Sequence, residues 1–283
     1  MKKLSFISLS FVLVFIFGLS GCKKDIKTVE NTMVFDSLML AETYYLNSDP
    51  KQPSCNLQVN FVYPNEYKDE KILSKVQILF INKFFGEQYI DQTPQNALQS
   101  YKDKYIENFK QFQKEITEKA SEEADEIEDR EFPSYYMKLK NSVLFNKNDI
   151  VSFQVNNDVY EGGAHGSHGI YCYALDLKKG SFINEQQIFS DDYKKPLASI
   201  IVNKILEANN LADPQELEDN GYSSAEDIVP NNNFLIDEKG ITYYFNEYEI
   251  AAYVVGITKV FIPYSELAPF MKKDSPIAGL AGL

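Results

Sequence analysis

The chain contains two histidines, His165 and His168, which stand three residues apart in a glycine-rich segment, residues 161–169. Imidazole nitrogens bind zinc, and Glu161 could add a carboxylate ligand. Two histidines on one loop still lack a further ligand and the groups that would hold them in place. The other interpretation is a turn in which Gly162 and Gly163 supply positive φ angles and His165 bonds to the backbone. The sequence favours the turn, so we expect no metal, cofactor or catalytic residue here, and keep these glycines and histidines as candidate ligand contacts.

A second candidate site is a cluster of aromatic and acidic residues near the C-terminal end, namely Tyr243, Tyr244, Tyr248, Glu249 and Tyr253. Tyrosine combines an apolar ring with a hydroxyl, which suits protein interfaces and the faces of sugar rings. Neighbouring carboxylates would attract a basic partner. The alternative, which such patterns favour, is packing within a core or a hairpin.

The first cysteine, Cys22, ends an N-terminal segment of distinct character. A basic start is followed by an almost unbroken apolar run, residues 4–19, and then by Leu-Ser-Gly-Cys at 19–22. This resembles the signal peptide and lipobox of a bacterial lipoprotein, in which Cys22 carries the lipid. A transmembrane anchor is the alternative, but this run would span only about 24 Å of a hydrocarbon core of about 30 Å. We expect a lipid anchor in the bacterial cell envelope, facing the periplasm or the outside.

The other two cysteines, Cys55 and Cys172, both fall in segments that look like strands. Outside the cytoplasm they could form a disulfide, provided that the two strands are neighbours. The alternative is a pair of buried free thiols, because cysteine also packs as a small apolar residue. The sequence leaves both open.

The composition limits the function classes. The 283 residues carry a net charge of −13, which argues against a nucleic-acid binder because such a protein needs basic side chains opposite the phosphates. A hydrophobic fraction of 44% argues against wholesale disorder. The acidic balance would suit a basic partner.

The elements that position the candidate residues follow from hydrophobic periodicity. Alternation predicts strands at 55–63, 135–145, 150–160 and 170–177, a hairpin at 234–245 and a last strand at 254–262. Spacings of three and four predict helices at 71–85, from 94 onward, at 193–209 and from 263. Thr93 and Pro94 read as a helix start. Strands and helices that do not alternate strictly predict an α+β fold with antiparallel sheet and packed helices, in two small subdomains that are adjacent or intertwined.

Two motifs resemble known families. Gly-Gly-Ala-His-Gly at 162–166, followed by Tyr-Ala-Leu-Asp-Leu at 173–177 and a Lys-Gly turn, resembles the PdaC/SigV-type extracytoplasmic domain. Residues 241–256 and 261–267 resemble the signature of the RsiV C-terminal domain family, a family of unknown function, with Glu247 and Ala252 in place of its two usual prolines. The predicted organisation is a signal peptide at 1–21, a tether at 22–48, a PdaC/SigV-type domain at 49–180, an RsiV C-terminal-type domain at 181–272 and a loose tail at 273–283.

The resemblance implies an envelope function. In relatives, this domain pair forms the outer, lysozyme-binding part of an anti-sigma factor, and the first domain also precedes a peptidoglycan deacetylase. We expect neither of those effector parts here. The sequence therefore predicts a lipid-anchored, non-catalytic binding protein that recognises a lysozyme-like protein or a cell-wall glycan. The alternatives are a metal-assisted envelope hydrolase that uses the Gly-Gly-Ala-His loop, and a purely structural lipoprotein.

Overall fold

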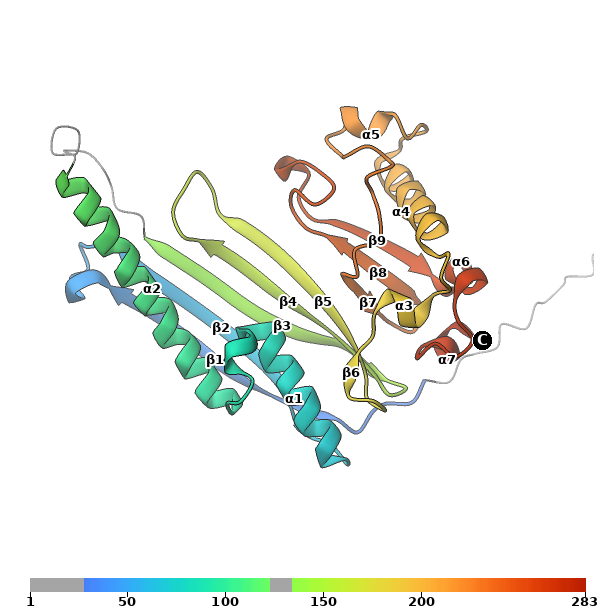
Figure 1. The fold of residues 1–283 in the computed structure, drawn as a ribbon, viewed down its shortest axis with the longest axis horizontal. Coiled ribbons are helices and arrows are strands. Elements are labelled where there is room, and N and C mark those ends of the chain that lie inside the picture. Colours follow the sequence, from blue (N-terminus) through green and yellow to red (C-terminus); the bar gives the residue numbers. More distant parts are fainter. Residues whose placement is uncertain (1–27, 123–133) are drawn as a thin grey trace, which may run out of the picture.

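Helices and two separate sheets make up the described part of the chain, residues 28–122 and 134–283 of a computed structural model (Figure 1). The predicted α+β class is confirmed. The expected signal peptide at 1–21 and the lipidation site Cys22 lie outside the described residues. Within the described ranges, no helix has the length and apolar character needed to cross a membrane.

The large sheet has the strand order β1-β2-β3-β4-β5-β6. Strands β2 and β3 run parallel, and every other pair of neighbours is antiparallel. Parallel neighbours require a long crossover connection, which the two helices between β2 and β3 supply. The strands are β1 (Val34–Tyr45), β2 (Ser54–Glu66), β3 (Tyr135–Lys147), β4 (Ile150–Tyr160), β5 (Ser167–Asp176) and β6 (Ser181–Phe182).

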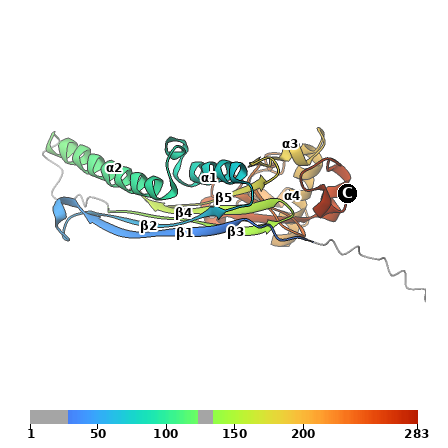
Figure 2. The ribbon, with the colours of Figure 1, turned by 90° about the horizontal axis from the view of Figure 1, so that it is seen from below.

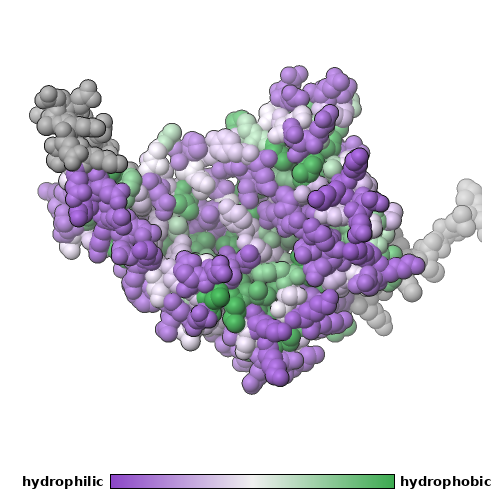
Figure 3. Space-filling model, in the orientation of Figure 1, coloured by the Kyte–Doolittle hydropathy of each residue, from purple (hydrophilic) through white to green (hydrophobic). Residues whose placement is uncertain are grey.

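Helices α1 (Glu70–Phe85) and α2 (Pro94–Glu122) lie on the same face of this sheet (Figure 2). The Asp69 side chain caps α1 by accepting from two backbone N–H groups. At the start of α2, Thr93 Oγ1 accepts from Asn96 N at 3.3 Å, as the sequence predicts. Figure 3 shows this helix-covered side, where hydrophilic residues dominate the surface and apolar residues appear in smaller patches.

The core of the first unit lies between these helices and the sheet. Alternate residues of β2, Leu57, Val59 and Phe61, are buried there, whereas Gln58 and Asn60 between them face away and are exposed. This confirms the alternation seen in the sequence, and no helix among the described residues of this half covers the second face of the sheet.

The second unit is built on a three-stranded antiparallel sheet, β7 (Phe234–Ile236), β8 (Gly240–Phe245) and β9 (Thr258–Pro263). Helix α4 (Lys194–Asn209) packs against it and shares its hydrophobic core. The remaining helices are single turns: α3 (Glu185–Ile188), α5 (Glu216–Asp219), α6 (Tyr264–Leu267) and α7 (Ala278–Ala281). Short 3-10 turns occur at η1 (Leu46–Ser48), η2 (Glu87–Tyr89), η3 (Tyr253–Val255) and η4 (Ala268–Phe270).

The two units are joined along β4 and β5. Ser152 Oγ on β4 donates to Ile236 O at 2.8 Å and accepts from Ile236 N at 3.1 Å. Cys172 on β5 is buried against Leu235 and Tyr244 of the small sheet. The second unit therefore covers one end of the face that the helices leave free, and the other described elements leave the rest of that face open.

The predicted segment boundaries need correction at both ends. Residues 34–48 of the expected tether are β1 and the turn η1, because Leu38, Leu40 and Tyr44 pack against the core as an edge strand. The expected loose tail at 273–283 carries α7, with Ile277 and Leu280 buried in the second core. The first unit also extends to residue 182, since β6 pairs with β5.

Cys55 and Cys172 do not form a disulfide; both are free and buried. Cys55 lies on β2 and Cys172 on β5, with β3 and β4 between them. Three strand spacings of about 4.8 Å separate the two strands, more than the roughly 7 Å between Cα atoms that a disulfide can span. The alternative of two buried thiols is the one that holds. Burial raises the pKa of the Cys55 thiol to about 12.

Candidate functional site

The glycine-rich segment is the connection between two adjacent antiparallel strands, β4 and β5. Gly162 and Gly163 have φ angles of 90° and 103°, as expected for a turn built on glycine. His165 Nδ1 lies 2.9 Å from Gly166 O, so this nitrogen donates to the backbone. The turn interpretation is confirmed for His165. His168 is different, because it stands on β5 itself, beyond the turn.

The second segment of the site is the loop between β8 and β9, which the second unit brings against this turn. Glu249 holds the loop in shape: Oε2 accepts from Asn246 N at 2.7 Å and Oε1 from Asn231 Nδ2 at 2.6 Å. Tyr248 adopts a φ of 65°, which is uncommon for a bulky side chain, and the residue is 65% exposed. A large ring is thus displayed to solvent on a backbone conformation that has a cost.

Three rings from these two segments form one cluster, His165, Tyr253 and Tyr248, which we call the ring cluster. The ring centroids of His165 and Tyr253 are 4.4 Å apart and stacked, and those of Tyr253 and Tyr248 are 5.7 Å apart and stacked. Tyr248 OH lies 3.5 Å from His165 Nε2, the nitrogen that remains an acceptor. Both His165 and Tyr248 are exposed, so the ring cluster presents aromatic surface to solvent.

The outer edge of β5 holds the second unit in this position. Glu247 Oε2 accepts from His168 N at 3.2 Å, and Asn246 Oδ1 accepts from Ile170 N at 2.8 Å. Asn233 Oδ1 accepts from Cys172 N at 2.7 Å, and its amide nitrogen donates to Ile170 O. Side chains therefore satisfy backbone groups that a further strand would otherwise pair with.

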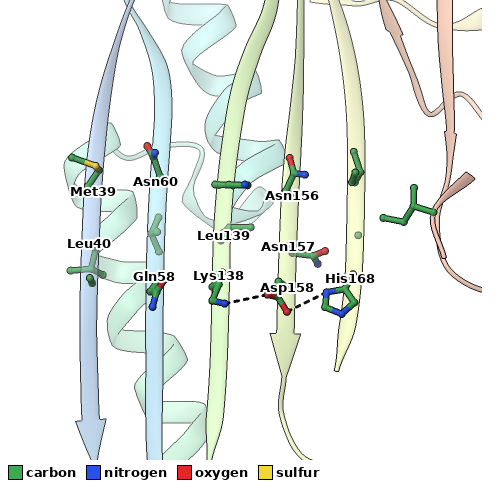
Figure 4. Close-up of a pocket in the computed structure, with 16 residues that line it drawn as sticks. Met39, Leu40, Gln58, Asn60, Lys138, Leu139, Asn156, Asn157, Asp158 and His168 are labelled. Atoms are coloured by element: carbon green, nitrogen blue, oxygen red, sulfur yellow. Dashed lines mark ion pairs between the residues drawn. The ribbon is translucent and has the colours of Figure 1, made fainter. Parts of the chain in front are cut away.

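Next to the ring cluster, the open face of the large sheet forms a shallow groove with a volume of about 680 Å³. We call it the sheet groove. Figure 4 shows its polar side chains standing on neighbouring strands. Its lining comes from β1 to β5 and from one residue of the second unit: Met39, Leu40, Ala41, Gln58, Val59, Asn60, Lys138, Leu139, Lys140, Asn156, Asn157, Asp158, His168, Gly169, Ile170 and Ile257.

The strand register arranges these side chains in rows across the sheet. One row runs Gln58, Lys138, Asp158 and His168, each directly opposite the next. Lys138 Nζ lies 3.5 Å from Asp158 Oδ2, and His168 Nδ1 lies 3.3 Å from Asp158 Oδ1 (Figure 4). A proton on Nδ1 would face Asp158, and in that tautomer the Nε2 of His168 is an acceptor.

The row nearer the ring cluster carries Tyr136 and Tyr160, which pair across β3 and β4 with ring centroids 6.1 Å apart. Asp158 raises the pKa of Tyr136 through a hydrogen bond. A Cβ added at Gly166 would lie 3.0 Å from Tyr136 OH, so the glycine lets this ring reach the turn. Tyr253 OH in turn donates to Gly166 O at 3.4 Å. The ring cluster therefore adjoins Tyr136 on β3, the strand whose Lys138 and Lys140 line the sheet groove.

The structure divides the residues that the sequence singled out. It brings Gly162, Gly163 and His165 together with Tyr248 and Tyr253. It places Glu249 as a brace for the loop. Tyr243 and Tyr244 are 0% and 8% exposed, so the prediction that they contact a ligand is wrong. Their strand β8 lies in the middle of the small sheet, with one face on the second core and the other against Cys172.

Sequence reasoning missed the sheet groove. Its polar side chains alternate with buried residues along each strand, so the sequence alone indicates only a solvated side; examples are Lys138 and Lys140 on β3 and Asn156 on β4. It also missed Asn233, whose bonds to β5 cross more than 60 residues. The two histidines have different partners: His165 lies against Gly166 O and Tyr248, and His168 against Asp158. Among the described residues, no group of three or more His, Cys, Asp or Glu side chains could hold a metal ion.

Two family models match the chain. The family described as "Deacetylase PdaC" matches residues 65–168, which hold α1, α2, β3 and β4. The family described as "Protein of unknown function (DUF3298)" matches residues 186–265, which hold the small sheet.

Two crystal structures resemble the whole fold. A member of the DUF3298 family from Bacteroides fragilis is 29% identical, with a TM-score of 0.82 over 90% of this chain and 99% of that one. A DUF3298 family protein from Pseudomonas aeruginosa is 13% identical, with a TM-score of 0.59 over 85% of this chain and 96% of that one. The second likeness shows the fold alone.

A curated relative corrects one expectation. Peptidoglycan-N-acetylmuramic acid deacetylase PdaC of Bacillus subtilis (strain 168) is 23% identical over 181 residues, 63% of this chain and 36% of that protein. The match thus spans about a third of the relative's length. Similarity to a deacetylase contradicts the prediction that this protein is not an enzyme. The comparisons together identify a PdaC-type domain followed by a DUF3298-type domain in this chain.

Proposed function

We propose that this protein binds peptidoglycan glycan chains in the bacterial cell envelope. The observation that carries the proposal is the ring cluster, in which His165, Tyr253 and Tyr248 display stacked aromatic surface beside the sheet groove. Tyrosine rings offer an apolar face to sugar rings and a hydroxyl at the rim. The energy cost of holding Tyr248 at positive φ is easier to understand if its exposed ring makes contact with a ligand.

The lining of the sheet groove also supports a glycan. Gln58, Asn60 and Asn156 offer amide donors and acceptors, which match the hydroxyl and acetamido groups of sugars. The backbone that carries these side chains is fixed by strand pairing, so binding does not have to order it. The name of the Bacillus subtilis relative adds that a protein with a similar domain acts on peptidoglycan.

The envelope location rests on the same relative and on the lipobox-like segment at Cys22. Lipid attachment at Cys22 would hold the folded units at a membrane surface, in the periplasm or outside the cell. Labelling cells with a fatty acid tests it: the wild-type chain should carry the label, and Cys22→Ser should not. Label on Cys22→Ser would contradict attachment at that thiol.

The binding proposal is tested with the full chain in detergent and soluble peptidoglycan glycan strands, by calorimetry or fluorescence anisotropy. We expect Tyr248→Ala and Tyr253→Ala each to weaken binding about tenfold, the effect of removing an aromatic contact of about 1.4 kcal/mol. Tyr171→Ala is the matched control, because Tyr171 is 43% exposed on β5 but lies outside the ring cluster. Equal binding by all three variants would contradict the proposal.

A lysozyme-like protein remains a second candidate partner because the chain is acidic, with a net charge of −13. Binding to lysozyme that persists in about 0.3 M salt and depends on Tyr248 would support docking at the ring cluster. Binding that disappears with salt, or that an unrelated basic protein matches, would reflect bulk charge and remove this candidate.

A second candidate function is removal of acetyl groups from peptidoglycan sugars, the activity in the name of the Bacillus subtilis relative. Water adds to the acetamido carbonyl carbon, the C–N bond breaks, and acetate and a free amine remain. His168 favours this candidate, because Asp158 faces its Nδ1 and leaves Nε2 to accept the proton of water. Acetate release that is lost in His168→Ala and kept in His165→Ala would support it, and no release by the wild-type chain would remove it.

A further inference from the structure

The sheet groove contains two lysines in different electrostatic situations. Lys138 and Lys140 are two positions apart on β3 and therefore face the same side. Lys138 is ion-paired with Asp158. Lys140 is exposed and forms no ion pair with any residue in the described ranges.

The register surrounds Lys140 with neutral groups. Asn60 on β2 and Asn156 on β4 stand directly opposite it, and Met39 and Ile170 continue the same row on β1 and β5. Asn156 Oδ1 is shielded from solvent and has no hydrogen-bond partner among the described residues. We call these five residues the Lys140 row. It is a single positive charge flanked by amides, with apolar side chains at both ends.

The wider charge distribution makes this row unusual. The chain has 41 acidic against 28 basic residues, yet Asp158 is the one carboxylate among the described residues that line the sheet groove. Asp158 already faces Lys138 and His168. An anionic group at Lys140 would therefore meet an unpaired ammonium and amide donors without a free carboxylate beside it.

We propose that the Lys140 row binds the carboxylate of an acidic sugar, and that the preferred ligand is a peptidoglycan glycan strand stripped of its peptides. In such a strand, the lactyl side chain of each muramic acid ends in a free carboxylate. In an intact strand, that group is consumed in the amide bond to the stem peptide. This inference rests on the proposed glycan-binding function and specifies the chemical class that the site selects.

The distance between the two parts of the site sets the size of the ligand. Tyr136, which reaches the turn at Gly166, and Lys140 are four residues apart on β3, about 13 Å along the strand. A ligand that stacks near the ring cluster and also places a carboxylate at Lys140 must therefore be an oligosaccharide. A single acidic sugar would reach only one of the two parts.

The test compares three ligands of matched length with the full chain in detergent: peptide-free glycan strands, the same strands with their carboxyl groups reduced to alcohols, and strands that retain stem peptides. We expect the wild-type chain to prefer the peptide-free strands over the reduced strands about fivefold at low salt. In Lys140→Gln the preference should fall to about one, while affinity for reduced strands stays unchanged. Lys140→Arg should keep the preference, because it keeps the charge.

Lys71→Gln is the matched control, since Lys71 is exposed on α1, on the helix-covered side of the sheet. It should behave as the wild type does. Two results would overturn the role of Lys140 and leave glycan binding intact. One is equal affinity of the wild-type chain for peptide-free and reduced strands. The other is a Lys140→Gln variant that loses affinity for all ligands equally. Equal, Lys140-dependent binding of strands with stem peptides would overturn the preference for stripped strands. No binding of any strand would overturn the proposed function itself.

Discussion

The two faces of the large sheet are made by the same strands, but they differ in almost every physical respect. On the helix-covered face, the ring centroids of Phe80 and Phe153 are 4.0 Å apart and the rings stack. The ring centroids of Phe61 and Phe84 are 4.6 Å apart. On the open face, neighbouring positions carry amides and an ion-paired row.

This difference follows from the period of two along a strand. Leu57 and Gln58 are consecutive residues, yet one belongs to a dry core and the other to a solvated groove. The first face fixes the position of the strands, and the second can then change its side chains at little cost to the fold. A substitution in β2, β3 or β4 should therefore affect stability or ligand binding according to the face on which it falls.

Alkaline pH should produce the largest effect, through groups on the covered face. Burial raises the pKa values of Cys55, Tyr101 and Tyr135 to about 12. Above pH 9 to 10 the unfolded chain loses these protons while the folded chain keeps them, so the free energy of unfolding falls as pH rises toward 12. Each group contributes up to about 1.4 kcal/mol per pH unit.

Denaturant unfolding at pH 8, 10 and 11 measures this slope. In Tyr101→Phe the slope above pH 10 should be shallower than in the wild type, because one of the ionising groups is gone. An unchanged slope would show that Tyr101 ionises equally in the folded and the unfolded chain. It would contradict the inference that burial on the covered face keeps Tyr101 protonated.

Phe153→Ala should have the next largest effect. Phe153 is fully buried and stacks on Phe80, so truncation removes apolar contact and leaves a cavity. We expect a loss of about 3–5 kcal/mol in the free energy of unfolding. Gln58→Ala, on the open face of β2, is the control and should cost less than about 0.5 kcal/mol. Similar losses for both variants would contradict the inference that the covered face supplies the stability of the sheet and the open face does not.

Lys138→Ala should have a much smaller effect on stability than Phe153→Ala. Its ion pair with Asp158 joins a lysine side chain that is 55% exposed to a carboxylate that is 31% exposed, and such pairs contribute about 0–1 kcal/mol. Thermal unfolding in low and in about 0.5 M salt measures this contribution, which salt should reduce further. A loss above 2 kcal/mol would mean that the open face also supports the fold.

Much of this architecture could be predicted from local sequence. The alternation in β2, the apolar spacing in α1 and the turn residues between β7 and β8 each reflect a short-range preference that the fold preserves. Strand β1 was missed because it is an edge strand in which no residue is fully buried. Glu42 also interrupts its inward side, where it pairs with Lys102 at 3.4 Å.

The candidate site was predictable only in part. The glycines and His165 lie in one short segment, so their turn could be recognised from the sequence. The meeting of His165 with Tyr253 depends on Asn233 and Asn246, whose bonds to β5 join positions 61 to 76 residues apart. Lys140 looks like any exposed lysine until the register places Asn60 and Asn156 beside it.

The side-chain bonds along β5 also bear on how copies of this protein could associate. A sheet grows into a fibre when both of its edges accept new strands. Here Glu247, Asn246 and Asn233 occupy the backbone groups of one edge, and β6 pairs with the end of the same strand. In the described part of the sheet, β1 is the long edge left open, so edge-to-edge pairing of two copies through β1 would give a closed dimer and stop there.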